Sequence, residues 1–181
     1  MHETDARVID PDTLQELDDG AVGEIIVHGP QVLRSYWNRP DANAGSFIER
    51  DGKRFLRTGD LGYRDAEGYF FAVDRLKRMI NVSGFKVWPA EVEATMYEHP
   101  AIRECCIISS PDDYRGETVK ALVTLHEAAR SATSPGNILS WARDRMASYK
   151  APRSVVFVDS LPRSESNKIG WRLLQDAEWK R

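Results

Sequence analysis

The turn Arg57-Thr58-Gly59-Asp60 places a carboxylate at the end of a strand-like run, where its oxygens can face outward. Such a carboxylate can accept two hydrogen bonds from a vicinal diol such as a ribose, which makes Asp60 a candidate for nucleotide binding. Taken alone, these four residues favour the alternative of an Asx-type turn with a solvated Asp60.

Two further candidates lie in the charged stretch that follows at residues 74–78. The planar guanidinium of Arg75 can fork onto hydroxyl groups or a phosphate, and Lys77 offers a movable point charge. A solvated charge run in a linker explains the same residues, and by itself that alternative is favoured.

Residues 81–89 predict two short strands around Gly84, a residue that permits close approach of the backbone to a ligand. Ser83 and Lys86 flank this point. A hairpin with a packed Phe85 or Trp88 explains the run equally well, and the sequence does not separate the two interpretations.

The polar loop at residues 161–168 ends on Lys168. A lysine on such a loop can swing into a water-poor site and stabilise charge that develops on a phosphate or carboxylate. Surface lysines are common, so the local context alone favours a solvated side chain.

The elements that must position these residues differ between the two halves of the chain. Residues 8–73 alternate short strand-like runs with Gly, Pro, Asn and Asp, which is typical of an antiparallel β unit. The runs are Gly23-Glu24-Ile25-Ile26-Val27, Arg54-Phe55-Leu56-Arg57, Leu61-Gly62-Tyr63 and, after an Asp65-Ala66-Glu67-Gly68 turn, Tyr69-Phe70-Phe71-Ala72-Val73.

Helical signals appear among the strands beyond the charged stretch. Pro89 predicts the start of one helix and Ser134-Pro135 the start of a second. Strands are predicted at residues 105–109, 119–125 and 154–158, with a short helix at the end. We therefore expect an α+β fold: an antiparallel β subdomain over residues 1–76, then an α+β domain over residues 77–181 with a three-stranded sheet, a β-hairpin and helices on one side.

Composition excludes several classes of function. A formal net charge of -3 and a pI near 5.8 argue against a nucleic-acid partner. No apolar run reaches the roughly 20 residues that span a bilayer, so we expect no transmembrane segment and a cytoplasmic location. Cys105 and Cys106 are neighbours on a predicted strand and point to opposite faces, which predicts reduced thiols. The scattered histidines predict no metal held by protein ligands alone.

The motifs occur in an order that closely resembles AMP-forming acyl-CoA synthetases, and the resemblance covers nearly the whole chain. The matching runs are Arg57-Thr58-Gly59-Asp60, Val73-Asp74-Arg75-Leu76-Lys77, Met79-Ile80-Asn81-Val82-Ser83-Gly84-Phe85-Lys86-Val87-Trp88-Pro89, Tyr149-Lys150-Ala151-Pro152 and Leu161-Pro162-Arg163-Ser164 through Lys168. The residues of these motifs are most similar to those of long-chain fatty-acid CoA ligases.

The resemblance implies a two-step reaction, in which ATP with Mg²⁺ and a fatty acid give an acyl-adenylate, and coenzyme A then gives the thioester. It also implies a role for each candidate residue. The implied roles are ribose and phosphate binding by Asp60 and Arg75, a hinge at Lys77, catalysis of adenylation by Lys168, and contact with coenzyme A by Ser83, Gly84 and Lys86.

Two departures and one absence accompany the resemblance. Asn167 stands where the family usually has Gly, and Arg78 stands where an acidic residue is common after the hinge. The family's phosphate loop and its acyl pocket have no counterpart here, so the implied partner is the missing N-terminal part of the same enzyme, and we expect the chain alone to be inactive. The alternatives are a short-chain or aryl acid-CoA ligase, another adenylating enzyme, or a non-catalytic module that binds coenzyme A.

Overall fold

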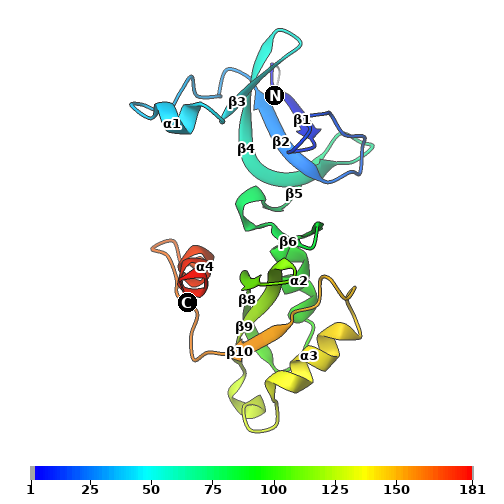
Figure 1. Ribbon diagram of the computed structural model, residues 1–181. Helices are drawn as coiled ribbons and strands as arrows, with labels where there is room; N and C mark the ends of the chain where they lie inside the picture. Colours follow the sequence, from blue (N-terminus) through cyan, green and yellow to red (C-terminus); the bar gives the residue numbers. More distant parts are fainter. Residues whose placement is uncertain (1–2, 181) are drawn as a thin grey trace. The chain divides into compact units, whose positions relative to one another are not determined.

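Short strands bounded by turn residues make up the first part of the chain in the computed structural model, which describes residues 3–180 (Figure 1). Five strands form an antiparallel sheet in the order β1-β2-β4-β3, and β5 pairs with β4. The elements are β1 (Asp5–Ile9), β2 (Gly23–His28), the short helix α1 (Pro40–Asn43), β3 (Phe47–Arg50), β4 (Lys53–Arg64) and β5 (Phe70–Arg75).

Strand β4 is a single curved strand, whereas the sequence predicted two separate strands within it (Figure 1). Its pairing with β5 shifts register between Leu61 and Gly62, which lets the strand bend without ending. A Cβ atom added to Gly62 would lie 2.3 Å from the carbonyl oxygen of Phe71, so only glycine admits β5 at this point. The strand is anchored by Phe55, which is fully buried with Ile9 and Ile26.

The second part of the chain is a mixed α+β unit. Its sheet runs β10-β9-β6-β7 with β8 on the other side of β9; only the β9–β10 pair is parallel. The elements are β6 (Ile80–Val82), β7 (Phe85–Val87), α2 (Pro89–Met96), β8 (Ile102–Asp112), β9 (Gly116–Leu125), α3 (Pro135–Arg143), β10 (Ser154–Phe157) and α4 (Trp171–Trp179), with short 3-10 turns at Leu76–Arg78 and Glu127–Ala129. The α+β class predicted from the sequence is confirmed. The predicted hairpin is β6–β7, and it belongs to the same sheet as the three predicted strands.

Helices cover both faces of this sheet, so the prediction that they lie on one side is wrong (Figure 1). Cys105 and Ile107 point into the core that α2 and α3 cover, whereas Cys106 and Ile108 point to the face where Trp171 and the rest of α4 pack. Both faces of β8 are therefore apolar, which explains why residues 105–108 form a continuous hydrophobic run. The two cysteines are free and lie in separate clusters, as the strand alternation predicts.

The predicted helix starts are confirmed. Helix α2 begins at Pro89, where the missing amide hydrogen costs nothing. Helix α3 begins at Pro135, and the side chain of Ser134 accepts a hydrogen bond from the amide of Asn137 in a reciprocal capping box.

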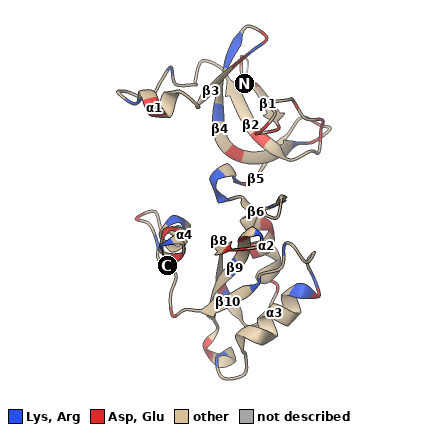
Figure 2. Cartoon of the chain, in the orientation of Figure 1, with Lys and Arg blue, Asp and Glu red and all other residues tan. Residues whose placement is uncertain are grey.

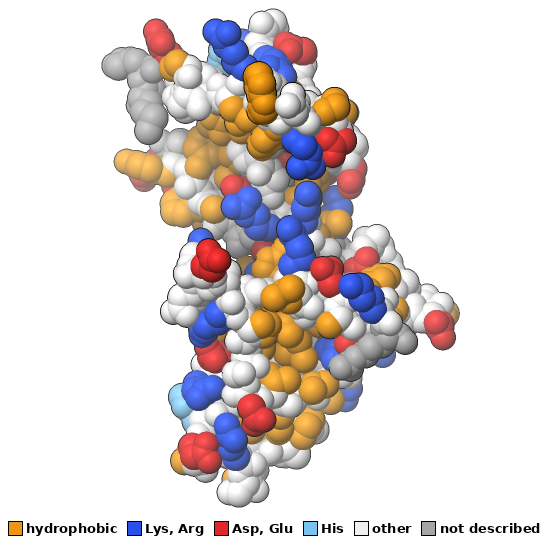
Figure 3. Space-filling view, turned by 90° about the vertical axis from the view of Figure 1, so that its left-hand side faces the viewer, with side chains coloured by type: hydrophobic (Ala, Val, Ile, Leu, Met, Phe, Trp, Pro, Cys, Tyr) orange, Lys and Arg blue, Asp and Glu red, His pale blue; other side chains and the backbone are white. Residues whose placement is uncertain are grey.

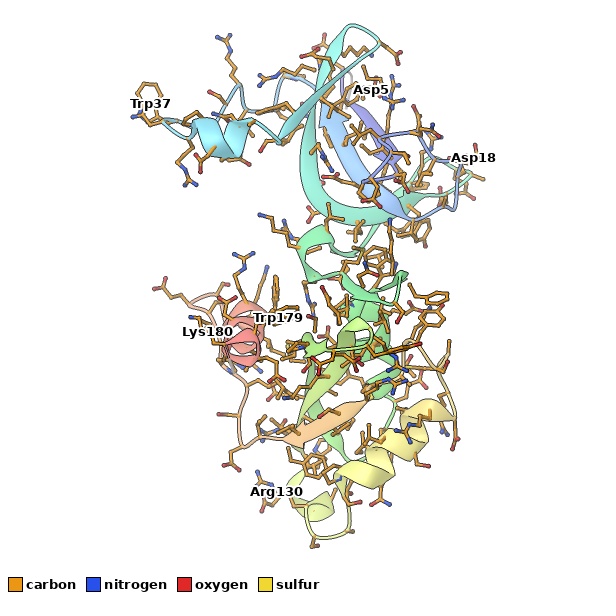
Figure 4. The ribbon with its side chains drawn as sticks, in the orientation of Figure 1. Asp5, Asp18, Trp37, Arg130, Trp179 and Lys180 are labelled. Atoms are coloured by element: carbon orange, nitrogen blue, oxygen red, sulfur yellow. The ribbon has the colours of Figure 1, made fainter. Side chains whose placement is uncertain are left out.

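Charged side chains of both signs are spread over both parts of the chain, in agreement with the small net charge (Figure 2). On the face seen in Figure 3, hydrophobic side chains gather in a continuous band in the lower part of the view, with charged groups beside it. Trp37 is the most exposed large hydrophobic side chain at 88% and projects from the loop before α1 (Figure 4). Within residues 3–180, no helix is both long and apolar enough to cross a membrane.

Candidate functional site

The register of β4 and β5 brings Asp60 and Arg75 side by side. The two residues are partners across the antiparallel pair, and Nε of Arg75 lies 2.8 Å from Oδ1 of Asp60 in an ion pair. Their side chains are 37% and 65% exposed, so a ligand can reach both. The guanidinium has four further N–H donors, which suits it to bind hydroxyl or phosphate oxygens next to the carboxylate.

Asp60 lies inside β4, so the prediction that it stands in a turn at a strand end is wrong: residues 57–61 form an irregular stretch of that strand, where the pairing with β2 shifts register. This stretch is held by Glu24, a residue that the sequence did not single out. Glu24 is 1% exposed, and its carboxylate accepts hydrogen bonds from Nε of Arg57 at 2.8 Å and from the amide of Gly59 at 3.1 Å. Gly59 has a φ of +69°, a conformation that glycine adopts without strain. The signal for this residue was a lone acidic side chain inside an apolar strand, because a buried charge needs a partner.

Thr58 completes the support of this irregular stretch of β4. Its hydroxyl donates to the carbonyl oxygen of Ile25 at 2.6 Å and accepts from the amide of Asp60 at 3.0 Å. These bonds join the stretch to β2, so the sheet sets the direction of the Asp60 carboxylate.

Lys77 lies at a boundary in the chain. The structure divides into two units, Met1–Lys77 and Arg78–Arg181, and Lys77 is the exposed middle residue of the 3-10 turn there. The next residue, Arg78, belongs to the second unit: it forms an ion pair with Glu93 at 2.5 Å and lies 5.7 Å from the ring of Trp171. The chain is thus fixed firmly just after Lys77.

Ser83 and Gly84 form the two-residue loop of the β6–β7 hairpin. Their φ angles are +52° and +89°, the pattern of a tight hairpin turn in which both central residues are left-handed. The amide of Gly84 donates to Oδ1 of Asn81 at 2.9 Å, which stabilises the turn. No atom would contact a Cβ at Gly84, so the loop is open to an approaching molecule.

A cavity of about 170 Å³ lies beside this hairpin. The ring of Phe85 stacks on Tyr149 with 4.8 Å between centroids and closes one side, while Lys86 is exposed on β7. The lining residues are Val82, Ser83, Phe85, Arg115, Ser148, Tyr149 and Arg153. An aromatic wall with two arginines suits a ligand that has both an apolar part and a negative charge.

Lys168 lies at the end of a turn that closes on itself. The amide of Ser164 donates to the carbonyl oxygen of Lys168 at 2.8 Å, and the amide of Asn167 donates to the carbonyl oxygen of Ser164 at 2.9 Å. The φ of Asn167 is +61°, a left-handed conformation that Asn tolerates better than most residues other than glycine. This explains how Asn can stand where the resembling family usually has Gly.

The predicted residues therefore fall into separate groups. Asp60 and Arg75 form one pair in the first unit; Ser83, Gly84 and Lys86 share one hairpin in the second; Lys168 is exposed on another loop of that unit. None of them is brought to a cysteine. Burial raises the pKa of the Cys106 thiol to about 12 and raises that of Cys105 still further, so neither side chain provides a thiolate near neutral pH. Within residues 3–180, no group of three or more His, Cys, Asp or Glu side chains is placed to hold a metal ion.

Comparison with known proteins decides the family. Residues 91–168 match the family model of the AMP-binding enzyme C-terminal domain. The chain is 43% identical over 175 residues to a long-chain-fatty-acid–CoA ligase of Bacillus subtilis, which covers 97% of the chain. The chain belongs to the adenylate-forming enzyme family. The predicted resemblance is thereby confirmed.

Two further relatives show the breadth of the adenylate-forming family around this chain. A feruloyl-CoA synthase of Amycolatopsis is 42% identical over 166 residues and covers 92% of the chain. The crystal structure of ATP-bound MatB from Rhodopseudomonas palustris matches 98% of the chain with a TM-score of 0.88 and 34% identity. The chain spans 30% and 32% of the lengths of the two curated relatives, and 34% of the MatB chain.

Proposed function

We propose that this chain is the C-terminal part of an ATP-dependent, AMP-forming fatty-acid CoA ligase. The observation that carries the proposal is the Asp60–Arg75 pair, an exposed carboxylate and guanidinium 2.8 Å apart on two paired strands of an adenylate-forming chain. A ribose diol can donate to the carboxylate while the guanidinium binds an adjacent phosphate oxygen. The identity to the ligase of Bacillus subtilis favours a long-chain fatty acid as the acyl donor.

In the first step, a carboxylate oxygen of the fatty acid attacks the α-phosphorus of ATP, and pyrophosphate leaves. The Lys168 ammonium would lie against the carboxylate and the α-phosphate and stabilise the charge that develops there. Mg²⁺ would enter with ATP. In the second step, the thiol of coenzyme A attacks the acyl carbonyl; its proton is lost, the acyl–oxygen bond breaks and AMP leaves.

The two steps would use different faces of the second unit. Ser83 and Gly84, on their open hairpin turn, and the neighbouring Lys86 would contact coenzyme A in the second step. Lys77 would be the hinge between residues 1–76 and the mobile domain 77–181, and its place in a short exposed turn supports this role. The rest of the enzyme would supply the phosphate loop and the acyl pocket, so the chain alone would be inactive. We place the enzyme in the cytoplasm, where buried free thiols such as Cys105 stay reduced.

The feruloyl-CoA synthase supports an aryl acid as a second candidate substrate, because its identity to the chain is nearly as high. The acyl pocket would decide between the two, and it lies outside this sequence. A non-catalytic module that binds coenzyme A is the alternative outside the enzyme class.

The test uses the full-length enzyme that contains this chain. Thioester formation is measured from free acid plus ATP and from preformed acyl-adenylate, with hexadecanoic acid and ferulic acid as the two acids. Lys168→Ala should slow the ATP-dependent route by about 10²-fold or more and leave the second route nearly unchanged. Lys180→Ala, which removes another exposed lysine of the same unit, is the matched control (Figure 4).

Each outcome has a clear meaning. Equal rates for Lys168→Ala and Lys180→Ala on the ATP-dependent route would contradict the role of Lys168. Faster turnover of ferulic than of hexadecanoic acid would favour the aryl substrate. An unmodified enzyme that makes no thioester from any acid would support the non-catalytic module.

A further inference from the structure

The turn that carries Lys168 is spanned by a guanidinium. Nη1 of Arg163 donates to the carbonyl oxygen of Asn167 at 2.7 Å. That carbonyl belongs to the peptide unit directly before Lys168, so the contact acts on the backbone of the candidate catalytic lysine. Arg163 also forms an isolated β-bridge with Ile169, which places it across the turn from the residue that follows the lysine.

The same guanidinium reaches the sheet of the second unit. Nη2 of Arg163 forms an ion pair with Oε1 of Glu104, a residue of β8. Strand β8 pairs with β9 from residue 102 to residue 112, with a register shift between Ile102 and Glu104, and Glu104 stands opposite Thr124 in this pair. Arg163 therefore links a rigid strand to the peptide that precedes Lys168.

Glu104 suits this role because it is only partly accessible to water. Its side chain is 22% exposed, and a second cation, Nη2 of Arg103, lies 3.8 Å from its other oxygen. Two guanidinium groups therefore face this carboxylate. Hydrogen bonds between ionised partners are stronger than neutral ones and hold a planar guanidinium in one orientation.

The flanks of the turn, Leu161 and Ile169, pack against an apolar cluster on β8 and β9, but the turn itself has few other ties to the domain. Residues 163–168 are all exposed, and the buried side chain nearest to them along the chain is Leu161. The hydrogen bonds between Ser164, Asn167 and Lys168 are internal to the turn and would move with it. Within the exposed residues 163–168, the Arg163–Glu104 pair is thus the side-chain contact that joins the turn to the sheet.

We propose that Arg163 is a positioning residue for adenylation, and that it acts by fixing the Lys168 peptide to Glu104 of β8. This inference rests on the proposed function, because it assigns Arg163 to the step in which Lys168 would act. Lys168 would touch the reacting groups, and the Arg163–Glu104 pair would hold Lys168 in place. A displacement of a catalytic group by about 1 Å can lower the reaction rate on the order of 10²-fold, so loss of this pair should slow adenylation measurably.

The test compares variants of the full-length enzyme on the two routes to thioester. Arg163→Ala should lower kcat of the ATP-dependent route about tenfold or more, with the KM for ATP changed much less. The route from acyl-adenylate should stay within about twofold of the unmodified enzyme, because the lysine does not act there. Arg163→Lys, which keeps the charge but not the fork, should recover only part of the loss.

Arg103→Ala is the matched control, because it removes the other arginine beside Glu104 and leaves the Asn167 carbonyl untouched. It should stay within about twofold on both routes. Glu104→Ala should slow only the ATP-dependent route, and adding it to Arg163→Ala should cost little more, because both substitutions break one link.

Two results would overturn the proposal. One is an Arg163→Ala enzyme with a normal ATP-dependent route; the other is an enzyme impaired equally on both routes, since damage to folding would act on both. Lys168→Ala is measured in parallel. If Lys168→Ala slows the ATP-dependent route and Arg163→Ala does not, only the positioning role fails; if Lys168→Ala slows neither route, the proposed function of the lysine fails as well.

Discussion

Removal of the Glu24 carboxylate should destabilise the first unit far more than removal of an exposed glutamate. Glu24 is nearly buried and serves two groups, the guanidinium of Arg57 at 2.6 Å and the amide of Gly59. Breaking a buried ion pair from one side typically costs 3–5 kcal/mol. The Arg57 side chain is 23% exposed, so water can partly solvate the stranded charge. We therefore expect Glu24→Ala to lower the free energy of unfolding by about 3 kcal/mol, the low end of that range.

The assay must report on one unit, because two units that unfold separately make a single denaturation curve ambiguous. Amide hydrogen exchange in peptides from β2 and β4 gives the free energy of opening for this sheet alone. Glu49→Ala on β3 is the matched control, since that side chain is exposed, and its cost should stay within about 0.5 kcal/mol.

The double variant tests the reasoning about charge. Arg57→Ala placed in the Glu24→Ala background should cost less than it does alone, because it removes the charge that Glu24→Ala left unpaired. If Glu24→Ala lowers the free energy of unfolding no more than Glu49→Ala does, the argument that the Glu24 carboxylate holds residues 57–61 of β4 is refuted. If the effects of Glu24→Ala and Arg57→Ala on the free energy of unfolding simply add in the double variant, the ion pair is not the source of the stability.

Three further predictions concern the second unit. Gly84→Ala should destabilise the β6–β7 hairpin by about 1–2 kcal/mol through its φ of +89° alone, since a Cβ there meets no atom; exchange of the hairpin amides measures this. Gly136→Ala at the start of α3 should be neutral or stabilising, as measured by exchange of the α3 amides. Burial and the charge of Arg145 lower the pKa of His99, whose Nδ1 accepts a hydrogen bond from the amide of Ala101 at 3.1 Å. The contribution of His99 to the free energy of unfolding should therefore be complete above the unfolded pKa of 6.5 and fall as the pH drops below it. Urea midpoints measured from pH 8 to 5 should show this fall, and His99→Gln should remove it. Lys120 forms an ion pair with Glu178 of α4 at 2.7 Å, and both side chains are nearly buried. Lys120→Met should therefore lower the free energy of opening of α4, measured by amide hydrogen exchange, by about 2–3 kcal/mol. Unchanged protection of the α4 amides would contradict this.

Local signals in the sequence were sufficient for the helix starts and most of the strands. Pro89 and Ser134 act through their own backbone geometry and capping groups, so their effect does not depend on distant residues. The alternation of Cys105 and Cys106 between two faces likewise follows from strand geometry alone.

Two features of the fold needed information that no local window contains. The curved strand β4 continues past Gly62 because β5 packs closely against the missing side chain, and that neighbour comes from a later part of the chain. The apolar run at residues 105–108 fits a strand covered on one face or on both, and the docking of α4 decides the matter.

Local backbone preferences and motifs read along the chain were enough to predict the class of the fold, the family and the order of the candidate residues. Which of these residues are neighbours became known from the folded chain. Asp60 and Arg75 are joined by strand register, Glu24 on β2 is bonded to the amide of Gly59 on β4, and Arg163 reaches Glu104 across the domain. Such contacts depend on strand pairing and on packing between distant segments, and neither leaves a periodic signal in a single sequence.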